Sequence, residues 1–263
     1  MSTIISQEMR TVFITGASSG IGEACARVLA KDQSYRFLLC ARRLSNLEIL
    51  KDEILKTNPN TQVQCFELDV RNNEQIERAL LNLPNEWREI DVLINNAGLS
   101  QGLDSIQNGN VGDWDRMIDT NIKGLLYISR SIIPMMEKSK NAHIINLGSI
   151  AGKEVYPNGN VYCATKHAVD ALTKAMRIDL LEKGIRVTSI DPGMVETEFS
   201  EVRFKGDKTR AKEVYKGLTP LSGEDIAEII AFVLSRPAHV NINDLLVMPT
   251  AQATGTLVHR NTD

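Results

Sequence analysis

The sequence has few of the features that mark secreted, membrane or metal-binding proteins. None of its apolar runs approaches the ~18 residues of a membrane span. Residues 1–10 lack the basic start and apolar core of a signal peptide. The four cysteines have no C-x-x-C spacing, and the four histidines have no metal-ligand spacing. We therefore expect a cytoplasmic protein without a metal site.

The sequence also lacks a strong excess of positive or negative charge. The 263 residues carry a formal net charge of only −3, which gives no indication of a basic surface for nucleic acid or anionic lipid. Repeats, low-complexity segments and linkers are absent, and the hydrophobic content of 43% is that of a globular protein. These observations favour one domain that acts on a small molecule, with neither nucleic acid nor membrane as a partner.

Short apolar segments alternate with amphipathic ones along the chain. Strands are predicted at residues 12–15, 37–40, 63–68, 92–95, 144–147, 186–190 and 245–248. Helices are predicted from a glycine-rich turn to residue 31 and at residues 44–56, 73–83, 113–136, 162–182 and 224–235, the last capped by Ser222. This alternation predicts one doubly wound α/β Rossmann domain over residues 1–263, with a parallel seven-stranded sheet and helices on both faces. Residues 196–218 break the pattern, and we expect an irregular lid there.

The glycine-rich turn after the first strand is the strongest local motif. Gly16, Gly20 and Gly22 form G-x-x-x-G-x-G, followed by a predicted helix. Glycines allow the backbone amides and the helix N-terminus to approach a pyrophosphate closely. The alternative is that they serve only tight packing.

The end of the second strand predicts which dinucleotide binds. A NAD site usually has an acid there, about 20 residues beyond the glycine turn, for the ribose 2′-hydroxyl. This sequence has no carboxylate at that place and has Arg42 and Arg43 instead. Guanidinium groups pair well with phosphate, so we predict NADP(H). The alternative is that the two arginines begin a solvated helix.

Tyr162 and Lys166 are four residues apart in a predicted helix and would share one face. An ammonium ~4 Å from a phenol favours the phenolate by about 4 kcal/mol at an effective dielectric of ~20. That would bring the tyrosine pKa from ~10 toward neutral pH, where acid–base catalysis is efficient. Ser149 lies upstream, at the end of a strand, and is placed to hydrogen-bond the same substrate oxygen. An isolated Tyr-x-x-x-Lys pair is common, so the rest of the sequence must support this interpretation.

Six motifs in this order resemble the short-chain dehydrogenase/reductase family. They are TGASSGIG from Thr15, NNAG from Asn95, Asn121, Ser149, Tyr162-x-x-x-Lys166 and Pro192-Gly193. Three longer segments, LPNEWREIDVLINNAGL, DPGMVETEFSEVRFKGD and PAHVNINDLLVMP, resemble its subgroup of NADP-dependent 3-hydroxy acid and serine (allo-threonine) dehydrogenases. The resemblance implies hydride transfer between NADP(H) and a short 3-hydroxy acid or its semialdehyde.

The same resemblance implies roles for individual residues. Tyr162 would be the catalytic acid/base. Lys166 would bind the nicotinamide ribose and lower the tyrosine pKa, Ser149 would steady the reacting oxygen, and Asn121 would hold a water. The implied cofactor-binding residues are Gly16, Ser18, Ser19, Gly20 and Ile21 at the phosphates and adenosine ribose, Asp69 and Val70 at the adenine, Asn95 at its ribose, Ala97 and Gly98 along the cofactor, and Pro192, Gly193, Val195 and Thr197 at the nicotinamide end.

The carboxylate of a 3-hydroxy acid needs a cationic partner, and the lid offers Arg203 and Lys205. The alternative is that both are solvated surface charges. Two rival functions stay open: a general carbonyl or ketoacyl reductase of the same fold, and an NADP-binding scaffold without turnover. The family resemblance also implies a homotetramer.

Overall fold

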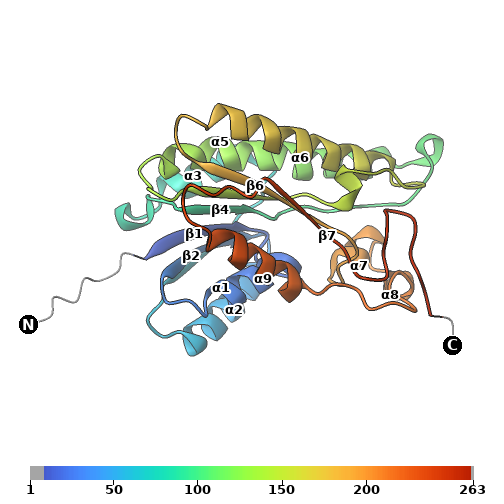
Figure 1. Cartoon of the computed structure of the whole chain (residues 1–263), viewed down its shortest axis with the longest axis horizontal. Helices are drawn as coiled ribbons and strands as arrows, with labels where there is room; N and C mark the ends of the chain where they lie inside the picture. Colours follow the sequence, from blue (N-terminus) through green and yellow to red (C-terminus); the bar gives the residue numbers. More distant parts are fainter. Residues whose placement is uncertain (1–8, 262–263) are drawn as a thin grey trace, which may run out of the picture.

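Seven parallel strands form one sheet in the computed structural model, which describes residues 9–261 (Figure 1). The sheet order is β3-β2-β1-β4-β5-β6-β7. The strands are β1 (Arg10–Thr15), β2 (Tyr35–Ala41), β3 (Val63–Glu67), β4 (Val92–Asn95), β5 (His143–Leu147), β6 (Arg186–Pro192) and β7 (Asp244–Val247). The chain order reverses between β1 and β4, where open α/β sheets bind ligands beyond the carboxyl ends of their strands. The predicted fold class and strand number are confirmed.

Helices cover both faces of the sheet (Figure 1). Each face has its own apolar core. One face carries α1 (Gly20–Leu29), α2 (Leu44–Thr57) and α9 (Gly223–Leu234); the other carries α3 (Asn73–Leu81), α4 (Val111–Ile118), α5 (Leu125–Met136) and α6 (Asn160–Asp179). Short 3-10 turns lie at η1 (Asn85–Trp87), η2 (Ile106–Asn108) and η4 (Ile150–Gly152). Ser222 caps α9 as predicted, in a reciprocal capping box with Asp225.

The helix predicted over residues 113–136 is not a continuous α-helix. A π-helical segment, η3 (Asp119–Gly124), separates α4 from α5. It lies against the first residues after β3: a methyl group built on Gly124 would come within 2.7 Å of the Val70 side chain. π-helical turns are frequent at functional sites, and this one contains Asn121.

The predicted lid, residues 196–218, is more regular than expected. It contains two short helices, α7 (Phe199–Arg203) and α8 (Lys208–Glu213). Asp207 stabilises the start of α8 because its carboxylate accepts hydrogen bonds from the amides of Thr209 and Arg210. The prediction of an irregular segment was therefore wrong in this respect.

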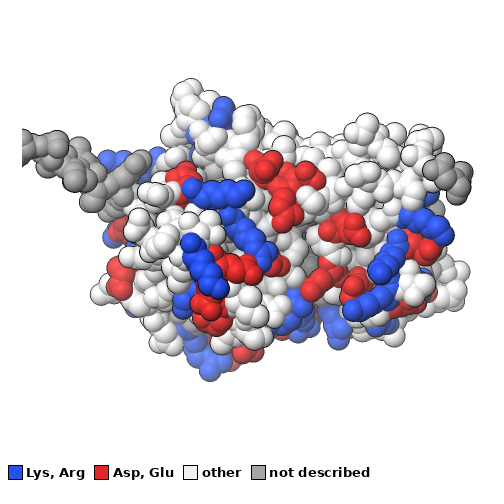
Figure 2. Space-filling view, turned by 90° about the horizontal axis from the view of Figure 1, so that it is seen from below, with Lys and Arg blue, Asp and Glu red and all other residues white. Residues whose placement is uncertain are grey.

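Within residues 9–261, none of the helices has the length and apolarity needed to cross a bilayer. The expectation of no signal peptide concerns residues 1–10, of which residues 1–8 lie outside the described part of the chain. On the face that carries α1, α2 and α9, acidic and basic side chains are interspersed (Figure 2).

Candidate active site

A cavity of roughly 680 Å³ extends across the carboxyl ends of the central strands. Its size suits a dinucleotide and a small substrate. Of the predicted site residues, those that line it are Gly16, Ser18, Ser19, Gly20, Ile21, Arg42, Arg43, Asp69, Val70, Ala97, Gly98, Ser149, Tyr162, Lys166, Pro192, Gly193, Val195, Thr197 and Arg203. Most of the predicted site residues therefore lie along one continuous cavity.

The glycine turn between β1 and α1 forms one end of the cavity. Gly16 and Gly20 have φ of +65° and +59°, a conformation that side chains disfavour. At Gly22, an added methyl group would lie 2.4 Å from the Asn96 amide nitrogen. Ser19 precedes α1 without a side-chain capping bond, so its hydroxyl leaves the first amides of the helix open to a ligand. This turn fits a pyrophosphate.

Asn95 does not reach the cavity, which contradicts its predicted contact with a cofactor ribose. Its side chain is buried and donates hydrogen bonds to Ser129 and Asn146, which tie β4 to α5 and β5. The neighbouring Asn96 lines the cavity instead and donates to the carbonyl oxygens of Thr15 and the glycine that follows it. Because successive strand residues face opposite sides, only one of the two can point into the site.

The polar end of the cavity holds more ion pairs than the sequence suggested. Arg43 donates to Glu198 of the lid segment at 2.8 Å, whereas Arg42 forms no ion pair within residues 9–261. The carboxylate of Asp69 is bound by the Arg71 guanidinium, and that hydrogen bond is the main reason why the pKa of Asp69 lies below its usual range. Arg71 also lines the cavity and was not predicted, although it lies only two residues after Asp69.

Asn121 is buried behind the cavity wall and does not line it. Its side-chain oxygen accepts from the amide of Leu99 at 2.9 Å, and its nitrogen donates to the Leu99 carbonyl and to Thr165. These bonds clamp the segment after β4 onto α6. The side chain is thus used for positioning, and a water held by this residue would have to be bound through its backbone.

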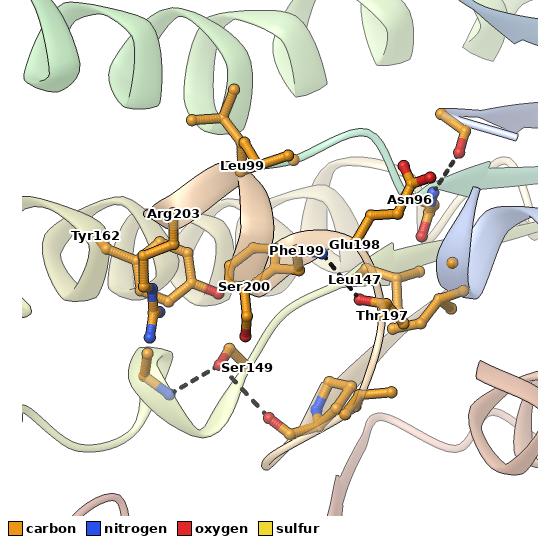
Figure 3. A pocket seen from close by; sticks show the side chains of 18 of the residues that line it. Asn96, Leu99, Leu147, Ser149, Tyr162, Thr197, Glu198, Phe199, Ser200 and Arg203 are labelled. Atoms are coloured by element: carbon orange, nitrogen blue, oxygen red, sulfur yellow. Dashed lines mark hydrogen bonds between the residues drawn. The ribbon is translucent and has the colours of Figure 1, made fainter. Parts of the chain in front are cut away.

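Tyr162, Ser149 and Lys166 all line the cavity, and Figure 3 shows Tyr162 and Ser149 at the end away from Asn96. All three side chains belong to buried residues, with exposures of 7%, 9% and 7%. The Ser149 hydroxyl oxygen accepts a hydrogen bond from the backbone amide of Ala151 at 3.1 Å. This bond to η4 orients the serine side chain. The Lys166 ammonium donates to the carbonyl oxygen of Leu147 at 2.8 Å.

The charge that acts most strongly on Tyr162 comes from Arg203 and not from Lys166. Burial raises the pKa of Tyr162 above its usual value, and the Arg203 guanidinium and a hydrogen bond from Ser149 oppose that rise. Lys166 is not among the groups that shift it, and burial lowers the pKa of Lys166 itself to about 8. The prediction that Lys166 brings the tyrosine pKa toward neutrality is not supported by this arrangement.

Arg203 extends from α7 into the same end of the cavity, beside Tyr162 (Figure 3). Its guanidinium carbon lies 5.4 Å from the centre of the Tyr162 ring and 5.2 Å from that of Phe199. Its Nε donates to the Ser100 hydroxyl at 3.1 Å and its Nη2 to the Tyr156 hydroxyl at 2.9 Å. These contacts fix the position of a cationic group next to the tyrosine.

Lys205, the other predicted carboxylate partner, does not line the cavity. Its ammonium pairs with Asp113 of α4 at 2.8 Å and so anchors the lid segment to the body of the protein. Its backbone φ is +54°, which turns the chain sharply after α7. The prediction of a substrate contact at Lys205 is not supported by this placement.

Several apolar and aromatic wall residues were not predicted. Phe199 packs against Tyr162 with ring centres 5.6 Å apart, and Tyr156 and Tyr215 line the cavity nearby. The hydroxyl of Tyr215 donates a hydrogen bond to the carbonyl oxygen of Val195. This bond holds the lid segment over the site. The only sequence signal was the clustering of aromatic residues near the predicted lid, which by itself also fits an ordinary core.

The doubly wound sheet, the glycine turn at its switch point and a buried tyrosine beside the Arg203 guanidinium define a dinucleotide-dependent α/β oxidoreductase. The chain belongs to the short chain dehydrogenase family, whose family model matches residues 10–208. The predicted family is confirmed.

Relatives match nearly the full length of the chain. The NADP-dependent 3-hydroxy acid dehydrogenase YdfG of Salmonella typhi is 45% identical over 252 residues, which cover 95% of this chain and 99% of that protein. The NADP-dependent 3-hydroxy acid dehydrogenase of Schizosaccharomyces pombe is 44% identical over 251 residues, 95% and 96% of the two chains. A solved structure of serine dehydrogenase in a closed form complexed with NADP+ is 44% identical, covers 95% of this chain and 100% of that chain, and superimposes with a TM-score of 0.88.

Proposed function

We propose that the protein is an NADP-dependent dehydrogenase that interconverts short 3-hydroxy acids, of the serine, allo-threonine or 3-hydroxypropionate type, and their 3-oxo acids or semialdehydes. The observation that carries this proposal is the position of Arg203. It places a fixed cation beside Tyr162, in the same cavity that has Arg42 and Arg43 at its other end. The similarity to NADP-dependent 3-hydroxy acid dehydrogenases supports the proposal.

The residues of this chain fit NADP(H). Gly16 and Gly20 provide the tight turn for a pyrophosphate, and the cavity wall has no carboxylate directly after β2. Arg42 and Arg43 would hold the 2′-phosphate, since guanidinium groups bind phosphate through several parallel hydrogen bonds. Asp69, Val70 and the segment Asn96–Gly98 would line the adenosine half, and Pro192, Gly193, Val195 and Thr197 the nicotinamide half.

Arg203 would hold the substrate carboxylate. Its Nε and Nη2 already donate to Ser100 and Tyr156 along one edge of the guanidinium. The terminal edge, formed by Nη1 and the second hydrogen of Nη2, retains donors for a bidentate bond to a carboxylate. A cation held beside the catalytic tyrosine therefore favours a substrate with its carboxylate close to the reacting carbon.

In the proposed mechanism, Tyr162 takes the proton of the substrate hydroxyl during oxidation and returns it during reduction. Arg203 favours the phenolate form of Tyr162. The Ser149 hydroxyl, which donates to the carbonyl oxygen of Pro192, would donate to the reacting oxygen instead. NADP(H), when bound, accepts or supplies the hydride. Aromatic and aliphatic walls around Tyr162 exclude water from the reacting atoms.

Lys166 and Asn121 would support this chemistry without touching the substrate. Lys166 would bind the nicotinamide ribose, and its pKa of about 8 leaves it mostly protonated at pH 7. The Asn121 side chain positions the segment that includes Gly98 and Leu99. An added methyl group on Gly98 would lie 3.3 Å from the Asn121 oxygen and 3.7 Å from the Lys166 nitrogen, so glycine keeps this junction open.

We also propose that residues 196–218 act as the lid of this single domain, and that the protein is a cytoplasmic homotetramer. The lid residues Phe199 and Arg203 close over Tyr162. Ile178 at the end of α6 and Phe232 on α9 are exposed by 75% and 49%, which suits burial between copies of the chain. Light scattering of the purified protein tests the assembly, and a monomer at micromolar concentration would refute it.

The direct test of the function is reduction of NADP+ followed at 340 nm with L-serine, L-allo-threonine, 3-hydroxypropionate and a neutral secondary alcohol, then repeated with NAD+. We expect turnover of the hydroxy acids with NADP+ and at least tenfold lower kcat/KM with the neutral alcohol or with NAD+. Preference for the neutral alcohol would favour a general carbonyl reductase. Absence of turnover with every substrate would favour a cofactor-binding scaffold.

A further inference from the structure

One of the two arginines at the polar end of the cavity already holds an anion from the chain itself. The Arg43 guanidinium donates to the Glu198 carboxylate at 2.8 Å, and both residues line the cavity. Their side chains are 46% and 50% exposed, so water reaches the pair and its partners can exchange. The adjacent Arg42 also lines the cavity and forms no ion pair within the described residues.

The backbone of the lid segment directs Glu198 toward this arginine. Glu198 immediately precedes α7. Two residues earlier, the backbone amide of Glu196 donates a hydrogen bond to the carbonyl oxygen of Leu221 at 2.8 Å. Thr197 lies over the glycine turn, where a methyl group built on Gly20 would come within 3.3 Å of its side chain. In Figure 3, Glu198 lies toward the Asn96 end of the site, away from Tyr162.

We infer that Glu198 is an internal competitor for the 2′-phosphate of NADP(H), holding Arg43 in the free protein and giving it up when the phosphate binds. This inference rests on the proposed function, because it requires the phosphate to be bound at Arg43. A phosphate monoester carries about −1.5 to −2 charges and three acceptor oxygens, so it is a stronger partner for a guanidinium than a carboxylate. A ribose 2′-hydroxyl is uncharged and leaves the pair intact.

The exchange has a consequence for the lid. Glu198 adjoins α7, the helix that carries both Phe199 and Arg203 beside Tyr162. While Arg43 holds Glu198, it ties the start of this helix to the loop after β2. Only a ligand with a 2′-phosphate breaks that tie, so phosphate binding and lid tethering oppose each other, and by linkage each weakens the other by the same factor.

The test is a binding measurement that needs no turnover. Calorimetry with 2′-phospho-ADP-ribose and ADP-ribose compares two ligands that differ only in the 2′-phosphate. Glu198→Gln should lower the Kd of 2′-phospho-ADP-ribose about two- to fivefold, the worth of an exposed ion pair, and leave that of ADP-ribose unchanged. Glu201→Gln is the matched control, because Glu201 lies in α7, forms no ion pair within residues 9–261 and does not line the cavity.

A second comparison identifies Arg43 as the shared partner. In an Arg43→Gln background, Glu198→Gln should lose most of its effect on 2′-phospho-ADP-ribose. Weaker phosphate binding in Glu198→Gln, an equal gain for both ligands, or an undiminished gain without Arg43 would overturn the inference. If the wild type binds the two ligands equally, the NADP preference itself fails; if it prefers the phosphate but Glu198→Gln changes nothing, only the role of Glu198 fails.

Discussion

Tyr162→Phe is expected to lower kcat by about 10²- to 10⁴-fold, the usual contribution of a positioned acid/base. Phenylalanine keeps the ring and its packing against Phe199, whose centre is 5.6 Å away, and removes only the hydroxyl. The affinity for NADP+ should stay within about twofold of wild type. Because burial holds the pKa of Tyr162 above its ordinary value, wild-type oxidation should accelerate as pH rises through neutrality, and this pH dependence should vanish in the variant.

Tyr156→Phe provides the control for this experiment. Tyr156 lines the same cavity, and its hydroxyl receives a hydrogen bond from Arg203 at 2.9 Å, but it is assigned no proton transfer. Its loss should change kcat less than tenfold. Steady-state kinetics at several pH values compare the two variants, and a Tyr162→Phe enzyme that keeps a tenth or more of the wild-type kcat would remove this tyrosine from the mechanism.

Arg203→Ala is expected to raise KM for 3-hydroxy acids roughly 10- to 100-fold, as for the loss of a hydrogen-bonded ion pair shielded from water. For a neutral secondary alcohol, KM should change little, because that substrate has no carboxylate to bind. The kcat for both substrates should fall by a smaller and similar factor, since Arg203 also favours the Tyr162 phenolate.

The matched control is Arg210→Ala, which removes another lid cation. Arg210 stacks on Phe204, with its guanidinium carbon 4.4 Å from the ring centre, and does not line the cavity. Initial rates over a range of substrate concentrations separate KM from kcat for each enzyme. Equal increases in KM for acids and neutral alcohols in Arg203→Ala would show that the residue shapes the lid and binds no carboxylate.

The sheet and the cofactor turn were predictable because their signals are local. Buried parallel strands read as continuous apolar runs, and Gly16 and Gly20 occupy positive φ values that favour glycine. Asn95 shows the limit of such motifs. Residues 95 and 96 are both asparagine, so residue type does not distinguish them. Only the alternation of side chains along the strand determines that Asn96 points into the cavity.

Long-range contacts were not predictable. Arg203 and Lys205 are both lid cations, yet one turns toward Tyr162 and the other pairs with Asp113. Similarly, the spacing of Tyr162 and Lys166 correctly predicted that both residues lie on one helix, α6. It did not predict which groups the ends of their side chains contact. The Lys166 ammonium reaches the carbonyl of a residue in β5 instead, so the strongest opposing charge on the tyrosine comes from a helix 41 positions further along the sequence.

The π-helical turn around Asn121 has the same cause. Hydrophobic periodicity predicts one helix over residues 113–136, because a single wider turn barely changes the pattern of apolar positions. The bonds between Asn121 and Leu99 and the close approach of Gly124 to Val70 are tertiary contacts. They determine the local geometry that the sequence pattern does not encode.

Transfer of isotope from substrate to cofactor tests the central claim most directly. The measurement uses 3-hydroxybutyrate that carries deuterium on carbon 3, NADP+ and the wild-type enzyme, with the reduced cofactor analysed by mass spectrometry. We expect NADPH that contains one deuterium per molecule. Reduced cofactor without deuterium, or no reduced cofactor from any 3-hydroxy acid, would contradict it.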